Sequence, residues 1–238
     1  PDGALYFADW SNIIIQHGEV DFRDERRDQI HGRIWRVTAK GQPLTKLADI
    51  AGAKIPQLLE NLKSDNRYLT DMSKRELIER GAKKVIPHLN KWLAQGQSEY
   101  SKLQALWLRV GINSPDQNLL KEVIASKDHR IRAAAVRVAT QQYSEMPGLI
   151  DIFKTTVKDQ AAIVRLETVN ALRVLNSTDA VEVALQALDS EVDKTIDYAL
   201  VLTVREMADH WIGKTIFNGN IKHLTYAVNA SRNPKALS

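Results

Sequence analysis

The sequence contains no cysteine. This absence excludes disulfide bonds, thiolate catalysis, thiolate metal sites and a Cys-x-x-Cys-His haem attachment within these 238 residues. Long hydrophobic runs are also missing, since the longest extend over only a few residues, as at Ala199-Leu200-Val201-Leu202. A helix that crosses a bilayer needs about 20 apolar residues. We therefore expect no membrane span in this segment.

The short motifs of common catalytic sites are lacking too. The sequence has no nucleotide-binding loop, His-Glu-x-x-His zinc site, nucleophile elbow or calcium loop. Its six histidines are scattered, at His17, His31, His88, His129, His210 and His223. We expect no metal site and interpret His88 and His129 as packing or surface residues.

The sequence has only a small excess of positive charge. The formal net charge is +4, and residues 1–50 carry 7 Lys and Arg against 8 Asp and Glu, which leaves 26 against 21 for residues 51–238. An excess this small, with both signs interspersed, is typical of a solvated helical surface. We therefore do not expect nucleic acid as the partner.

Residues 127–176 contain an internal repeat. In the two matching blocks Arg132 and Arg165 lie 33 residues apart, as do Val136 and Val169. Each block follows an apolar segment, 119–124 or 149–153. A period of this length is typical of stacked helical hairpins. The register extends to further positions in both directions: Thr70, Lys102 with Leu106, and Asp197 with Val201.

The pairs Ile131-Arg132 and Val164-Arg165, near the start of the second helix of each hairpin, resemble the HEAT repeat. The resemblance implies an α-α superhelix, so we predict a mainly α fold with about five HEAT-like hairpins, a solenoid, over residues 54–212. We expect the arginine to bridge adjacent turns and Val136 and Val169 to be buried between hairpins. Lys102 preserves the charge of the repeat, whereas Thr70 and Asp197 depart from it at the two ends.

Outside the repeats we predict three smaller parts. Residues 1–41 form a small N-terminal β segment, because 4–10 and 32–38 are short, aromatic or alternating runs bounded by turn formers, with a β-branched run at 13–15. Residues 42–53 are a linker, and 213–238 are a C-terminal cap and tail with a helix at 221–230 and frayed residues after it. So few strands need a covering surface. We expect the chain to be a fragment or a processed form.

The order of these parts supports a second resemblance. Pro1-Asp-Gly-Ala-Leu-Tyr-Phe-Ala-Asp-Trp10, followed by His31-Gly-Arg-Ile-Trp-Arg-Val37, is similar to a blade of the sorbosone and soluble glucose dehydrogenase-like β-propellers. In the bacterial group called PVC-type membrane-bound dehydrogenases, the last blade continues into HEAT repeats. The resemblance implies a periplasmic or cell-envelope location. It also implies that pyrroloquinoline quinone and haem c belong to the parent protein, with no cofactor within this segment.

The densest polar cluster lies between the two predicted strands. Loops at one end of a rigid sheet are where binding residues concentrate, and in the propellers that the segment resembles such loops face the central site for the quinone or a sugar. The candidate cofactor-binding residues are Asp9, Trp10, His17, Arg23, Asp24, Arg27 and His31. The alternative interpretation is a solvated loop with internal Arg–Asp pairs.

The sequence leaves three functions open. We favour an interaction or scaffold region whose partners are another protein or adjoining domains of the same protein. The first alternative is part of a quinone-dependent sugar or alcohol oxidoreductase whose active site lies mostly outside this chain. The second is a DNA-binding or DNA-repair solenoid, in which phosphate contacts would come from Arg130, Arg132, Arg137, Arg165, Arg173 and Arg205. We interpret Trp92, Trp107 and Trp211 as core packing residues rather than base-stacking platforms.

Overall fold

The chain is mainly helical and begins with a small antiparallel sheet. The computed structural model describes residues 2–10, 21, 23–141, 147–214 and 216–237. The sheet consists of β1 (Leu5–Trp10) and β2 (Gly32–Val37). The helices that follow are α1 (Ile55–Asn61), α2 (Arg67–Arg80), α3 (Ala82–Leu93), α4 (Glu99–Gly111), α5 (Gln117–Ile124), α6 (His129–Gln141), α7 (Leu149–Thr156), α8 (Ala162–Leu175), α9 (Thr178–Leu185), α10 (Lys194–Glu206), α11 (Ala208–Trp211) and α12 (Ile221–Ser231), with 3-10 turns η2 (Gln186–Asp189), η3 (Phe217–Gly219) and η4 (Pro234–Leu237).

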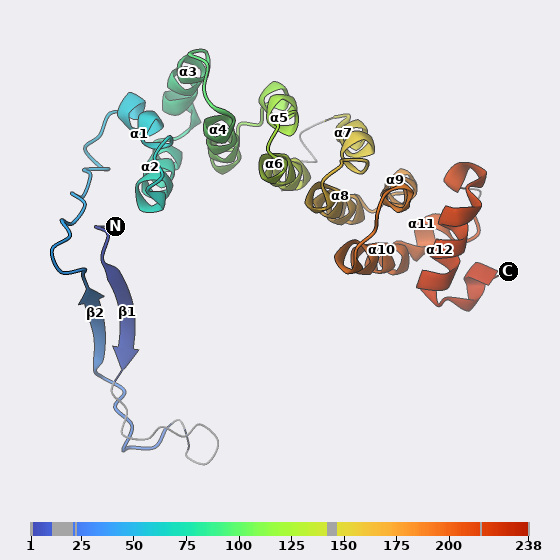
Figure 1. Cartoon of the computed structure of the whole chain (residues 1–238), viewed down its shortest axis with the longest axis horizontal. Coiled ribbons are helices and arrows are strands. Elements are labelled where there is room, and N and C mark those ends of the chain that lie inside the picture. Colours follow the sequence, from blue (N-terminus) through green and yellow to red (C-terminus); the bar gives the residue numbers. More distant parts are fainter. Residues whose placement is uncertain (1, 11–20, 22, 142–146, 215, 238) are drawn as a thin grey trace.

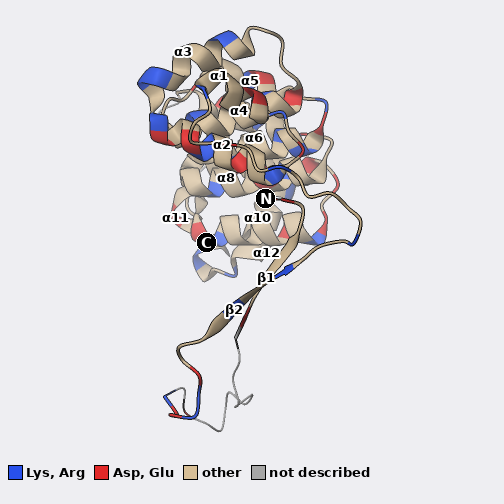
Figure 2. Cartoon of the chain, turned by 90° about the vertical axis from the view of Figure 1, so that its left-hand side faces the viewer, with Lys and Arg blue, Asp and Glu red and all other residues tan. Residues whose placement is uncertain are grey.

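The helices form a curved array of two rows (Figure 1). The odd-numbered helices α1 to α9 lie along one side of the array, and the even-numbered helices α2 to α10 lie along the other. Within pairs α1 packs on α2, α5 on α6 and α7 on α8, and between pairs α6 contacts α4 and α8 while α8 contacts α10. The β-hairpin extends from the N-terminal end of the array, away from the helices (Figures 1 and 2).

Side-chain caps set the start of several helices. Asn66, Ser98, Asp116, Ser177 and Asp193 each accept a hydrogen bond from a backbone N–H of the first helical turn. Gly81, with φ +81°, ends α2 as the sequence predicts for a glycine after a helix.

Two predicted helix starts are wrong. The run Asn113-Ser-Pro115 predicts a capping residue and a first-turn proline for α5, but the helix begins later because the Asp116 carboxylate accepts from the N–H groups of Asn118 and Leu119. Met146-Pro147 predicts the same for α7, but Pro147 precedes that helix, since Gly148, with φ +78°, is the residue before α7. Met146 lies outside the described residues.

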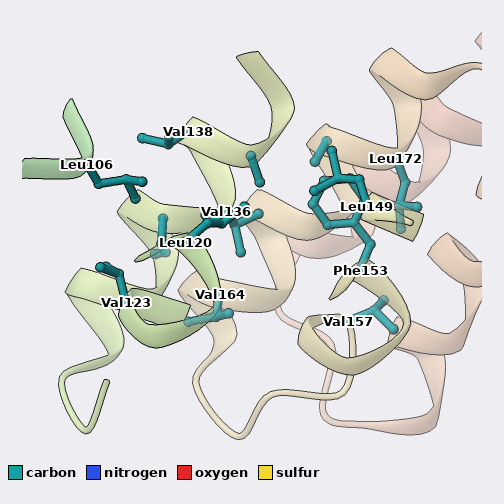
Figure 3. Packing of buried hydrophobic residues seen from close by; sticks show 14 of the residues in the cluster. Leu106, Leu120, Val123, Val136, Val138, Leu149, Phe153, Val157, Val164 and Leu172 are labelled. Atoms are coloured by element: carbon teal, nitrogen blue, oxygen red, sulfur yellow. The ribbon is translucent and has the colours of Figure 1, made fainter. Parts of the chain in front are cut away.

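The core runs without interruption from one helix pair to the next. Val136 and Val169, the equivalent positions of the repeat, have no exposed surface, which confirms the predicted burial. Figure 3 shows Val136 among side chains of its own and the neighbouring pairs, with Leu106 and Leu120 on one side and Phe153 and Leu149 toward the other. The apolar face of each pair is therefore covered by its neighbours.

The tryptophans of the array serve packing, as the sequence indicates. Trp92 and Trp211 are buried, and their indole N–H groups donate to the Glu60 carboxylate (2.7 Å) and the Val204 carbonyl (2.9 Å). Trp107 is half-buried, and the ammonium of Lys74 lies 5.0 Å from its ring centroid. Burial lowers the pKa of Lys74 although Asp71 opposes this effect.

The C-terminal tail is more ordered than predicted. The expected helix at 221–230 is present as α12, which packs on α10. Residues 231–238 were expected to fray, but 234–237 form the 3-10 turn η4. The cause is local, because the Asn233 side chain accepts from Lys235 N–H, its carbonyl accepts from Ala236 N–H, and Ala236 packs against the core.

Two valines of α8 test the inter-pair core. We expect Val169→Ala to lower the free energy of unfolding by about 1–3 kcal/mol through lost burial and a cavity. Val174, on the same helix, is 65% exposed, so Val174→Ala is the matched control and should change it by less than about 0.5 kcal/mol. Urea unfolding followed by circular dichroism measures both. Equal losses would show that the register of the repeat is wrong.

Candidate functional site

The β-hairpin carries two different faces. Its register pairs Leu5 with Val37, Phe7 with Trp35 and Asp9 with Arg33. These six side chains alternate with the others along the strands and form what we call the aromatic face. The rings of Phe7 and Trp35 stack with centroids 6.5 Å apart. The Asp9 carboxylate accepts from the Trp35 indole (3.0 Å) and lies 3.3 Å from the Arg33 guanidinium.

The opposite face is organised by Asp2. Its carboxylate accepts from the backbone N–H of Ala4 (3.1 Å), the Tyr6 hydroxyl (2.9 Å) and the Arg36 guanidinium. The Ala4 bond, together with those from Arg36 and Tyr6, lowers the pKa of Asp2 to about 2. The Asp2 carbonyl also accepts from Thr45 N–H (2.9 Å), which fastens the hairpin to the linker.

Both faces of this hairpin lie open to solvent. All six residues of β2 are exposed, and the apolar side chains Leu5 and Ile34 are 64% and 78% exposed on opposite faces. Among the described residues each strand pairs with only one other strand, so each has an outer edge with unpaired backbone groups. Such edges are templates for pairing with another chain. The hairpin is therefore an incomplete sheet.

The predicted binding loop makes internal contacts. The side chains of Asp24 and Arg26 pair at 2.8 Å, and that bond to Arg26 lowers the pKa of Asp24 well below its usual range. Arg27 is buried and donates to the Asp21 carbonyl, the Arg23 backbone N–H donates to the Asp21 carboxylate, and His31 hydrogen-bonds to Asp28 at 3.1 Å. These contacts agree with a solvated loop, and ligand binding by it stays a prediction.

The candidate residues are not gathered at one point among the described residues. Asp9 belongs to β1 and pairs across the sheet, whereas Arg23, Asp24, Arg27 and His31 lie in the loop, at the end of the hairpin away from the helices (Figure 1). Trp10 is the last residue of β1 and is in register with Gly32. His17 and the β-branched run 13–15 lie outside the described residues.

Metal-ion sites and membrane-spanning helices are both missing from the part of the chain that the structure describes. No group of three or more His, Asp or Glu side chains there could hold a metal ion. None of the helices in that part is long and apolar enough to cross a membrane.

Comparison with known proteins gives one finding for the β segment. A protein-family model described as a domain of unknown function (DUF7133) matches residues 1–41. The match covers both strands and the segment between them, and the helices of the described residues lie outside it. No curated protein matches the chain. The roles of residues in the hairpin therefore rest on their geometry.

The repeat arginines bridge neighbouring helix pairs, as the sequence predicts. Arg132 on α6 donates to both carboxylate oxygens of Asp159, in the turn between α7 and α8, at 2.7 and 2.8 Å. Arg165 on α8 is buried and donates to the Glu191 carbonyl, in the turn before α10. One pair earlier, Glu99 on α4 accepts from the Ser126 hydroxyl, in the turn between α5 and α6.

The other arginines considered as phosphate contacts also have partners within the chain. Arg130 pairs with Asp128, Arg137 with Glu167 and Arg173 with Glu206, and Arg205 donates to the Ala230 carbonyl. An arginine already paired to a carboxylate adds little to the attraction of a phosphate backbone. The arrangement therefore weighs against the DNA-binding interpretation.

The paired arginines predict a specific DNA-binding behaviour. We expect the chain to bind duplex DNA weakly, with an affinity that falls steeply as salt rises from about 50 to 200 mM. Fluorescence anisotropy with a labelled duplex of random sequence measures it. Tight binding that persists at about 150 mM salt would support the DNA-repair alternative instead.

The Arg132–Asp159 contact predicts a dependence of stability on pH. Burial raises the pKa of Asp159, but hydrogen bonds from Arg132 and the Ala161 N–H outweigh this effect and hold the pKa below its ordinary value. The pKa of Asp159 is lower in the folded chain than in the unfolded chain, where it is about 3.9. The ionised carboxylate therefore stabilises the fold at pH values above about 3.9, and this stabilisation is lost as the pH falls through the pKa of the folded state.

We therefore expect Asp159→Asn to lower the free energy of unfolding by about 1–3 kcal/mol at pH 7. The difference from the unmodified protein should shrink as the pH falls below about 4. Asp151, on α7, is the control because its side chain is 72% exposed in its pair with Lys154, so Asp151→Asn should cost less than about 0.5 kcal/mol. Urea unfolding at several pH values tests this, and a pH-independent difference would contradict it.

Proposed function

We propose that this chain is an interaction scaffold in which an array of helix pairs carries an incomplete β-sheet for docking. The observation that supports this most directly is the open hairpin. Its strands place aromatic and aliphatic side chains on both faces, with β2 exposed along its whole length. An isolated two-stranded hairpin is marginally stable in water, so further strands or a covering surface would stabilise it.

The helical part suits a scaffold role. We propose that it is a HEAT-like α-α superhelix. The support is the 33-residue period at Arg132 and Arg165, the contacts of α6 with α4 and α8, and the arginine bridges to the next turn. In such arrays each repeat contacts only its neighbours, and the elongated surface is used for binding.

The partner of the hairpin is, on this proposal, a β-sheet of an adjoining domain or of another protein. Edge pairing would satisfy the unpaired backbone groups of β1 or β2, and the stacked rings of Phe7 and Trp35 would be covered by a second layer. The sequence resemblance suggests that the sheet is a blade of a dehydrogenase-like propeller. Oxidoreductase chemistry with a quinone or haem c, and a periplasmic or cell-envelope location, are proposals that rest on that resemblance alone.

Amide exchange provides the test. In the 238-residue chain alone, we expect the amides of 5–9 and 33–37 to exchange rapidly while those of α6 and α8 are protected, because a lone hairpin opens easily. In the product of the complete gene, or in a complex with the partner, the hairpin amides should gain protection of roughly 100-fold or more. Mass spectrometry after deuterium labelling measures both states.

Matched variants locate the contact. Trp35→Asp should abolish the gain in hairpin protection, because it places a charge in the aromatic face that docking would bury. Tyr198→Asp is the control, since Tyr198 is exposed on α10, far along the array. Both should leave the unfolding of the helices within about 0.5 kcal/mol. Hairpin amides that exchange equally fast in every context would overturn the proposal.

A further inference from the structure

A groove lies between α1 and α3, on the odd-numbered side of the first two helix pairs. It encloses about 290 Å³ and is lined by Pro56, Leu59, Glu60, His88, Lys91, Trp92 and Gln95. Leu59 and Trp92 are buried and form an apolar floor, whereas Pro56, Glu60, His88 and Lys91 are exposed around it. The volume is close to the lower end of small-ligand pockets, which begin at about 300 Å³.

The indole in this groove is fixed in place. Trp92 donates its ring N–H to one oxygen of Glu60 at 2.7 Å, and the Lys63 ammonium lies 2.8 Å from the other oxygen and 5.5 Å from the ring centroid. The hydrogen bond from Lys63 holds the pKa of Glu60 below its usual value. The carboxylate of the groove is thus already satisfied by a cation, which removes most of its repulsion toward a second anion.

The α3 side of the groove is basic. Lys84, His88 and Lys91 are all exposed and lie at helical spacing on one stripe of α3, with Lys83 beside them. No Asp or Glu occurs in this helix, whose sequence is AKKVIPHLNKWL, and blue segments mark it in Figure 2.

We propose that the α1–α3 groove binds an acidic peptide segment of a partner protein. One apolar side chain of the peptide would lie on the floor made by Leu59 and the Trp92 ring. Flanking carboxylates would then lie beside Lys91 and Lys84, whose charges complement them, with the His88 ring between the two lysines as a hydrogen-bonding group. A duplex nucleic acid fits less well, because the basic stripe is confined to one helix and the arginines further along the array are engaged in ion pairs.

This inference deepens the proposed function by naming a class of partner for the scaffold. It rests on the helical array being an interaction surface and does not need the hairpin. Its failure can therefore be told apart from that of hairpin docking.

A peptide titration with the full chain tests the groove. The probe is a fluorescent twelve-residue peptide with one central leucine flanked by aspartates and glutamates, followed by anisotropy at about 50 and 150 mM salt. We expect it to bind at least about 10-fold more tightly than the same peptide with asparagine and glutamine at the acidic positions. Replacing the leucine by alanine should weaken binding by about 3- to 10-fold.

Charge-reversal variants place the peptide on α3. Lys91→Glu and Lys84→Glu should each weaken binding by about 10-fold or more. Lys121→Glu, at an exposed position of α5, is the matched control and should leave it unchanged. Trp35→Asp in the hairpin should also bind the peptide normally, whether or not hairpin docking occurs.

Three results would overturn the inference. The first is equal affinity for the acidic and amide peptides. The second is equal affinity of Lys91→Glu and Lys121→Glu for the acidic peptide. The third is displacement of the peptide by inorganic phosphate or by a DNA duplex at lower concentration than by unlabelled peptide, which would assign the site to a phosphate-bearing ligand.

Discussion

Mutual burial between neighbouring helix pairs is the interaction on which the rest of this structure depends. Several helices of the odd-numbered row are short, such as α5 and α7 with 8 residues each, and isolated helices of that length are unstable in water. They persist because Val123, Phe153 and their neighbours are buried against the adjoining pairs. The α1–α3 groove is held in place by this shared core.

Polar contacts between neighbouring pairs restrict how their apolar faces can pack. An apolar stripe alone allows neighbouring pairs to slide past each other, because hydrophobic burial is not directional. The bidentate contact of Arg132 with Asp159, and the contact of Arg165 with the Glu191 carbonyl, are each made in a single geometry. We interpret these bridges as fixing the register of one pair on the next.

The repeating part of the fold could be predicted from the sequence, because each of the two matching helix pairs needs a buried apolar residue and a bridging arginine at the same position. Val136, Val169 and the bridging arginines were all located from spacing. Helix starts were harder, since Asp116 and Asn113 are both good caps and only the actual hydrogen bonds decide between them. The aromatic face could have been suspected from the alternation in 32–37, but the stacking of Phe7 on Trp35 depends on a strand register that 21 intervening residues hide. The α1–α3 groove joins residues of two helix pairs, so no local pattern signals it.

The arrangement of contacts has a mechanical consequence for the curved array. Since the main contacts of α6 in the described part of the chain are with its partner α5 and with the pairs beside it, we expect small rotations at successive junctions to add up along the array. We therefore expect the distance between the hairpin at one end and α12 at the other (Figure 1) to be able to change while every junction keeps its core. A body held at the hairpin and one held near the C-terminus would be joined by a compliant tether rather than a rigid strut.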